Sequence, residues 1–154
     1  MAFGPVRTET EFCTPDAFAA PELSAEGETP LGAAIEHALE IIDERKETYR
    51  ENGINYYRPW IFLVTDGAPT DSWEKAAKRI QAGEKEGRFA FFPVGVQKAN
   101  MDVLAKLSTR QPLKLDGLRF RDLFTWLSRS LQKVSQSQLG CEVSLPSPSG
   151  WTAV

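Results

Sequence analysis

The chain has 154 residues, of which 42% are hydrophobic and 25% are charged, as expected for one globular domain. Its net charge is −3 and its basic residues are dispersed, which argues against nucleic-acid binding because phosphate contacts require clustered Lys and Arg. No apolar run is long enough to span a membrane, and residues 1–12 do not resemble a signal peptide. Cys13 and Cys141 sit in no CxxC pattern, so we expect reduced thiols in a cytoplasmic protein, with a bridge between them as the alternative.

The first third of the chain predicts a strand followed by a long helix. Residues 1–12 alternate apolar and polar side chains, which indicates a strand. A helix follows over about 29–49, because Thr29 is a suitable N-cap and Pro30 suits the first helical position. His37 flanks the apolar stripe of this helix, and we expect a boundary or surface residue rather than a metal ligand. The charged face of the helix predicts a solvated surface formed by Glu36, Glu40, Asp43, Glu44, Arg45, Lys46 and Glu47.

The rest of the chain alternates strands with helices. Residues 60–64 are apolar on both faces, which predicts a buried central strand of a parallel sheet. A helix should begin at Asp71, which forms a capping pattern with Glu74, and lead to a strand at 89–96 that we expect Pro93 to interrupt. The remaining predicted elements are a short helix capped by Asn100, a strand at 113–115 and a helix at 119–135.

This alternation predicts an α/β fold with an open, mostly parallel sheet between two layers of helices. We expect residues 1–135 to form the domain and residues 136–154 to form a C-terminal extension packed on it or trailing from it. Ligands of such sheets bind beyond the carboxyl ends of the strands. The loops at 27–32 and 65–70 should reach that edge, which is therefore the expected functional surface.

Three segments resemble parts of von Willebrand factor A-type (vWA) domains, in the order found in that family. Gly27-Glu-Thr-Pro-Leu-Gly32 and Leu63-Val-Thr-Asp-Gly67 resemble two metal-site loops, and Phe91-Phe-Pro-Val-Gly-Val96 resembles the next strand. Within the family, Phe120 to Ser137 and Leu145-Pro146…Gly150-Trp151 are similar to bacterial TerY-like proteins of tellurium-resistance clusters. The resemblance implies a Rossmann-like three-layer fold and a non-enzymatic protein-binding module. It also implies partners in a stress-resistance cluster, including kinase-type and phosphatase-type proteins.

The resemblance further implies a metal-ion-dependent adhesion site, which holds Mg²⁺ or another divalent cation on oxygen ligands. Thr29 would be the family's threonine ligand and Asp66 its aspartate. The Asp-x-Ser-x-Ser motif that supplies the other ligands is absent from the sequence, so we expect a partial site that holds an ion weakly or not at all. Without an ion, Thr29 is a helix cap and Asp66-Gly67 an ordinary turn, and both interpretations remain open.

The resemblance also places Ala2-Phe3-Gly4 at the end of the family's second strand. We therefore expect an N-terminally truncated domain that lacks the first strand and the first helix. The strand at 60–64 would then lie at an open apolar edge, and such edges recruit other strands. Two outcomes remain open: residues 1–12 cover this edge, or the chain is a self-associating fragment without metal that forms a homodimer there.

We do not expect an enzyme. Thr65-Asp66-Gly67 resembles the strand-terminal aspartate nucleophile of phosphotransferases, which is the one candidate for a hydrolase of the phosphotransfer type. Those enzymes need a second acid two residues later, and this chain has Ala68 there. The sequence also contains no P-loop, no Gly-x-Ser-x-Gly elbow and no Gly-x-Gly-x-x-Gly motif.

Overall fold

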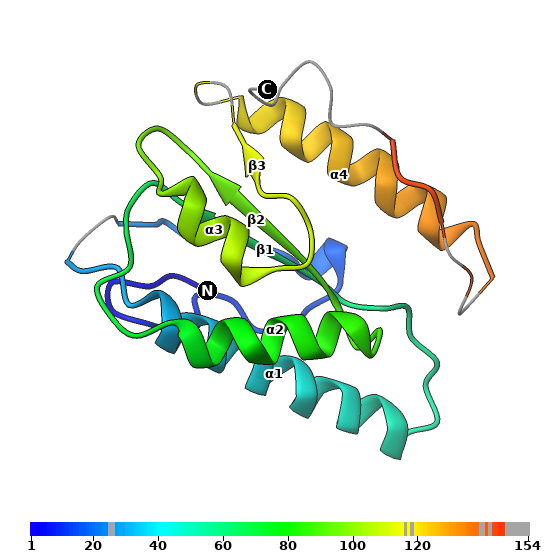
Figure 1. Cartoon of the computed structure of the whole chain (residues 1–154). Coiled ribbons are helices and arrows are strands. Elements are labelled where there is room, and N and C mark those ends of the chain that lie inside the picture. Colours follow the sequence, from blue (N-terminus) through cyan, green and yellow to red (C-terminus); the bar gives the residue numbers. More distant parts are fainter. Residues whose placement is uncertain (25–26, 116, 118, 139–140, 142, 147–154) are drawn as a thin grey trace.

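A parallel sheet of three strands, in the order β1-β2-β3, lies between helices on both of its faces (Figure 1). The computed structural model describes residues 1–24, 27–115, 117, 119–138, 141 and 143–146. The central strand β2 pairs with β1 in continuous register, from Trp60 opposite Ala90 to Thr65 opposite Gly95. The strands are β1 (Trp60–Thr65), β2 (Ala90–Gly95) and β3 (Leu113–Lys114).

Helices cover the two faces of the sheet unequally. On one face, Ile35, Ile80 and Leu104 come from three helices and pack with Phe91 of β2. On the other face, Trp126 packs with a second core cluster that includes Phe92. The predicted three-layer α/β fold and the predicted element order after residue 29 are confirmed. The helices are α1 (Leu31–Glu51), α2 (Glu74–Lys85) and α3 (Met101–Leu107) on the first face and α4 (Phe120–Ser135) on the second, with a short 3-10 helix at Pro15–Ala17.

Pro93 lies inside β2 without interrupting it, so the predicted break is wrong. The N–H of Ala90 donates to the carbonyl of Pro59 at 2.9 Å. The N–H of Val96 donates to the carbonyl of Thr65, also at 2.9 Å. Because alternate residues of a strand hydrogen-bond to opposite sides, even-numbered residues of β2 face β1 and Pro93 faces away from it. The missing N–H of Pro93 therefore removes no hydrogen bond between β1 and β2.

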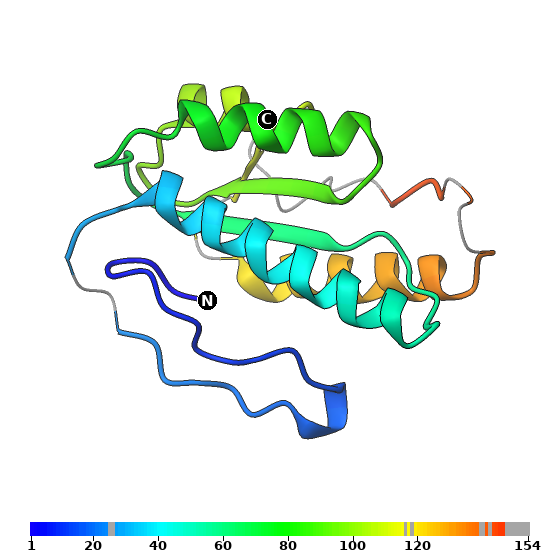
Figure 2. The ribbon, with the colours of Figure 1, turned by 90° about the horizontal axis from the view of Figure 1, so that it is seen from below.

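Residues 1–12 do not form the predicted strand. Gly4 has a φ of 121°, a conformation open to glycine, and the chain reverses there. Ala2 and Arg7 consequently form an isolated antiparallel bridge, with both N···O distances 2.9 Å. The segment lies on the side of β1 away from β2 (Figure 2). Within the described residues it makes no backbone hydrogen bond to β1, so it borders the edge of the sheet without extending it.

The polar side chains of α1 are less uniformly solvated than predicted. Lys46 is only 6% exposed, and its Nζ donates to the carbonyl of Arg88 at 2.7 Å. Burial lowers the pKa of Lys46, and the nearby charge of Asp43 opposes this only in part. His37 is half-buried, as expected for a boundary residue, and its Nε2 lies 3.1 Å from Oγ1 of Thr8. The solvated-face prediction is therefore wrong for Lys46, whose partner comes from a distant loop.

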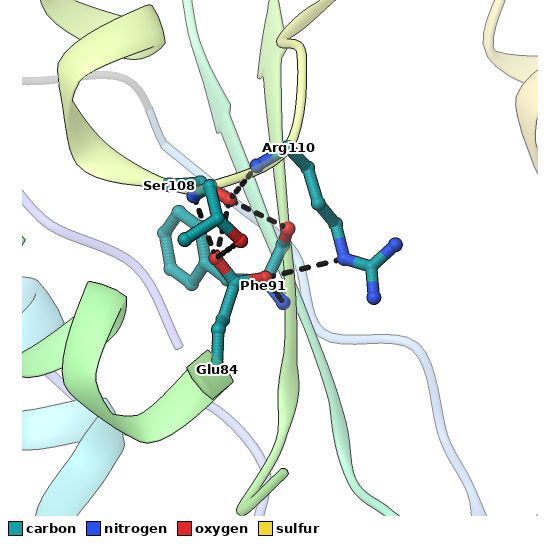
Figure 3. A network of polar contacts seen from close by, with 5 residues as sticks. Glu84, Phe91, Ser108 and Arg110 are labelled. Atoms are coloured by element: carbon teal, nitrogen blue, oxygen red, sulfur yellow. Dashed lines mark hydrogen bonds and ion pairs between the residues drawn. The ribbon is translucent and has the colours of Figure 1, made fainter. Parts of the chain in front are cut away.

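Glu84, near the end of α2, ties the start of β2 to the segment after α3 (Figure 3). Its side chain is 4% exposed and accepts hydrogen bonds from the N–H of Phe91 at 3.1 Å and from Oγ of Ser108 at 2.7 Å. The N–H and Oγ1 of Thr109 also donate, at 2.8 and 2.9 Å, and Nε of Arg110 completes the network at 3.2 Å. Burial raises the pKa of Glu84, but these hydrogen bonds outweigh it and hold the pKa below its ordinary value of 4.5.

The described part of the 136–154 segment contacts the second core. Nε1 of Trp126 donates to the carbonyl of Pro146 at 2.8 Å, and Leu145 packs against the same cluster. The hydroxyl of Tyr57 donates to the carbonyl of Ser137 at 3.0 Å. Trp151 lies outside the described residues. The division of the chain at residue 135 into domain and extension stays a prediction.

Candidate functional site

The loop that follows β1 is hydrogen-bonded to the loop that precedes α1. The N–H of Thr70 donates to the carbonyl of Thr29 at 2.9 Å. In return, the N–H of Thr29 donates to Oγ1 of Thr70 at 3.1 Å. The two loops expected at the carboxyl edge of the sheet are therefore joined into one surface, as the topology of a parallel sheet predicts.

Asp71 strengthens this junction in a way that the sequence analysis missed. Its two carboxylate oxygens accept hydrogen bonds from the N–H groups of Gly32 and Ala33, both at 2.9 Å. The carboxylate thus caps the first turn of α1, where backbone N–H groups lack partners and the helix dipole favours negative charge. The predicted role of Asp71 as the cap of α2 is wrong, because α2 begins at Glu74 without a side-chain cap.

Gly32 permits this close approach of the two loops. A Cβ at that position would lie 2.2 Å from the carbonyl oxygen of Ser72, a contact that real Cβ atoms do not make. The second loop therefore sits directly against the start of α1. The glycine at position 32, in the segment 27–32 that resembles the vWA family, is therefore explained by packing and does not require a bound ion.

Thr29 and Asp66, the two residues expected to bind a metal ion, are brought to the same edge. Gly67, which follows Asp66, lies close to Thr29, because a Cβ added to Gly67 would lie 3.2 Å from Oγ1 of Thr29. Thr29 does not cap α1 as predicted, because Asp71 takes that role and the helix begins at Leu31. Asp66 is exposed and makes no hydrogen bond or ion pair with the described residues. One hydroxyl and one carboxylate therefore remain available at this edge.

The donors at this edge fall short of a resident divalent-ion site. A cation such as Mg²⁺ takes about six oxygen ligands. Thr29 and Asp66 offer a hydroxyl and a carboxylate, whereas both oxygens of Asp71 are engaged by α1. Across the described residues, no group of three or more His, Cys, Asp or Glu side chains could hold a metal ion. The residues present do not by themselves fit the family's complete ion site.

A hollow of about 950 Å³ extends from this edge along the whole of β1. Thr29, Asp66 and Glu28 line its polar end. The rest of the lining comes mainly from apolar residues of β1, α1, α4 and the N-terminal segment. The expected functional edge and the free side of β1 are therefore continuous.

Comparison with known protein families identifies the fold. Residues 17–121, more than half of the chain, match the family model of the von Willebrand factor type A domain. The chain belongs to this family. The match includes both joined loops of the vWA domain and the strands β1 and β2. Comparisons with curated proteins and with solved structures found no significant match.

Two further observations concern this vWA domain as a whole. Cys13 and Cys141 are both free and exposed, so the alternative of a bridge between them is wrong. None of the described helices is long and apolar enough to cross a membrane.

Proposed function

We propose that this vWA domain is a non-enzymatic protein-binding module whose contact surface is the carboxyl edge of the sheet. The joined loops carry this proposal: Thr29 and Thr70 exchange hydrogen bonds, and Asp71 fixes the loop after β1 to α1. A surface that is already ordered loses little conformational freedom on binding, which favours affinity. The exposed carboxylate of Asp66 gives that surface a charged contact group.

We also propose that the same edge is a degenerate metal-ion-dependent adhesion site. Thr29 and Asp66 are the family ligands that remain, and two protein ligands support weak binding of Mg²⁺ at most. Calorimetric titration of Mg²⁺ and Mn²⁺ into the wild type and into Asp66→Ala tests this point. We expect a weak signal that the substitution removes, whereas identical flat isotherms would show that no ion binds at this edge.

The finer proposal concerns the biological setting. The similarity to TerY-like proteins supports cytoplasmic partners in tellurite or stress resistance, with kinase-type and phosphatase-type proteins as the first candidates. Two free, exposed cysteines suit a reducing compartment. Co-purification of the tagged chain with such proteins after tellurite exposure tests the assignment, and partners drawn from other processes would contradict it.

The binding surface itself can be tested with a matched pair of substitutions. Ala68 is exposed in the loop after β1, and Ala82 is exposed on α2. Ala68→Arg should reduce partner recovery at least about tenfold, a change worth roughly 1.4 kcal/mol, by placing a bulky charge in the contact surface. Ala82→Arg introduces the same charge elsewhere and should leave recovery unchanged. Equal recovery with both variants would contradict a carboxyl-edge surface.

A phosphotransfer-type hydrolase that uses Asp66 is the alternative that we do not favour. Its second acid would stand at position 68, where Ala68 has no proton to donate or accept. Hydrolysis of p-nitrophenyl phosphate by the wild type, lost in Asp66→Ala, would overturn the non-enzymatic proposal.

A further inference from the structure

A second hollow, of about 970 Å³, opens beside the starts of β1 and β2, at the end of the sheet opposite the carboxyl edge. Trp60 and Ala90, the first residues of the two strands, both line it. Sites for small molecules commonly have volumes of about 300–1,000 Å³, so the hollow is large enough for such a ligand. Unlike the hollow along β1, it is lined mainly by polar groups.

Basic side chains outnumber acidic ones in this hollow, although the whole chain carries a net charge of −3. Among the described lining residues, the acidic side chains are those of Asp43 and Glu86. The basic side chains are those of Lys46, Arg50, Arg58, Arg88 and Arg110. The excess of positive charge is therefore local to the hollow, where it favours the binding of an anion.

Three of the five basic side chains are already held by other groups of the fold. Nη2 of Arg88 lies 2.7 and 2.8 Å from the two carboxylate oxygens of Asp43. Arg50 forms an ion pair with Glu47 at 2.8 Å, and Nζ of Lys46 donates to the carbonyl of Arg88. The binding of a ligand therefore depends on the remaining two side chains.

These two are Arg58 and Arg110, which are both exposed. The guanidinium of Arg58 lies against Gly87, where a Cβ would be 2.8 Å from Nη2 of Arg58, and makes no hydrogen bond or ion pair with the described residues. The guanidinium carbon of Arg110 lies 5.2 Å from the ring centroid of Phe92, and only Nε of Arg110 bonds to Glu84. Figure 3 shows the two terminal nitrogens of Arg110 directed away from that network. Each guanidinium is thus supported on one side and keeps N–H donors for a ligand.

A phosphate monoester suits two guanidinium groups better than a carboxylate does. The planar fork of a guanidinium binds either anion through two parallel N–H···O bonds. A carboxylate has one charge and two oxygens, which a single fork can occupy. A phosphate monoester carries close to two charges at about pH 7 and has three acceptor oxygens, so it can bind two forks at once. Glu86, the acidic lining residue without a described partner, is exposed, and solvent screens its repulsion.

We propose that this hollow binds a small phosphate monoester, whose phosphate is bound by the guanidinium groups of Arg58 and Arg110 and whose organic group packs against Tyr56, Tyr57 and Trp60. The three aromatic side chains line the same hollow and offer apolar surface to the organic group. The site lies at the opposite end of the sheet from the two joined loops. It therefore does not rest on the proposed function, and failure of either proposal leaves the other standing.

A phosphorus NMR titration with phenyl phosphate at about pH 7 tests the site. The phosphorus resonance should shift when the wild-type chain is added. Arg58→Gln and Arg110→Gln should each raise the Kd at least about tenfold, because each removes one fork of charge-assisted hydrogen bonds. Arg121→Gln removes an exposed arginine at the start of α4, outside the hollow, and should change the Kd by less than about twofold. A wild type that causes no shift would overturn the proposal, and so would equal weakening by Arg58→Gln and Arg121→Gln.

Two related ligands, measured by displacement of phenyl phosphate, test the ligand class. Phenyl sulfate has the same shape but a single charge, and should bind at least about tenfold more weakly. Inorganic phosphate lacks the ring and should bind at least about threefold more weakly. Circular dichroism and thermal melting establish that the variants fold, and Arg58→Gln carries the test because Arg110 also contacts Glu84. Binding of either control ligand as tightly as phenyl phosphate would contradict a monoester site.

Discussion

The two ends of the sheet use a carboxylate in opposite ways. Glu84, near the start of β2, is nearly buried and accepts hydrogen bonds from the backbone of Phe91 and from Ser108 and Thr109. Asp66, at the end of β1, is exposed and has no such partner among the described residues. A ligand at Glu84 would have to displace several hydrogen bonds, whereas a ligand at Asp66 displaces only water. Burial and partner number thus separate a carboxylate that serves folding from one whose side chain is free for the binding role that we propose.

Removal of the Glu84 side chain should produce the largest change in stability. Glu84→Ala leaves the buried N–H of Phe91 and the hydroxyl of Ser108 without their acceptor, which should cost about 3 kcal/mol of unfolding free energy. Urea denaturation measures this loss. Glu86→Ala, at an exposed neighbouring glutamate, is the control and should change stability by less than about 0.5 kcal/mol. Similar losses of unfolding free energy in both variants would show that Glu84 is no more important to the fold than an exposed glutamate.

Asp71 should have the next largest effect. Asp71→Ala removes the acceptors for the N–H groups of Gly32 and Ala33, and loss of a helix cap costs about 1–2 kcal/mol. Asp71→Asn keeps one acceptor oxygen and should lose less. Urea denaturation of the three proteins gives the order. A loss for Asp71→Ala no greater than that for Asp71→Asn would contradict the double cap.

Glu84 should also make stability depend on pH. Its folded pKa lies below the ordinary value of 4.5, so the unfolded chain binds the proton more readily. The contribution is therefore fully present above pH 4.5 and is lost as the pH falls through the folded pKa. Unfolding free energies measured from neutral pH downwards should decline more steeply for the wild type than for Glu84→Gln. Parallel curves would mean that the hydrogen bonds do not favour the charged form.

Substitution of Asp66 should have the smallest effect on the stability of the fold. Asp66→Ala removes an exposed side chain without partners, so we expect a change within about 0.5 kcal/mol. The measurement is urea denaturation of the wild type and the variant under the same conditions. A loss of unfolding free energy as large as that of Asp71→Ala would show that Asp66 stabilises the fold. It would contradict the contrast drawn between Asp66 and Glu84.

Features encoded within a few neighbouring residues could be predicted from the sequence. The order of the strands and helices was predicted correctly, and their bounds nearly so, from the apolar stripes of α1 and α4 and from the alternation of strands with helices. Asn100 was found as a cap because its side chain accepts from the N–H of Val103, only three residues away, at 3.1 Å. The edge that carries Thr29 and Asp66 was also predictable, since parallel strands deliver their loops to one side.

Features that depend on distant segments were missed. Asp71 caps a helix 39 residues earlier in the chain, so its local D-x-x-E pattern indicated the wrong helix. Lys46 is buried because its partner, the carbonyl of Arg88, lies 42 residues later. At the N-terminus the alternating pattern was real, but Gly4 reverses the chain before a strand forms. In each case the competing interaction becomes visible only when the tertiary contacts are known.

Hydrogen exchange of the domain with a recovered protein partner tests the central claim most directly. If the carboxyl edge is the recognition surface, amides in residues 27–32 and 66–71 should exchange more slowly in the complex than in the free domain. Amides around Glu84, at the opposite end of the sheet, should be unaffected. Protection confined to the Glu84 end, with unchanged exchange in both loops, would contradict the account.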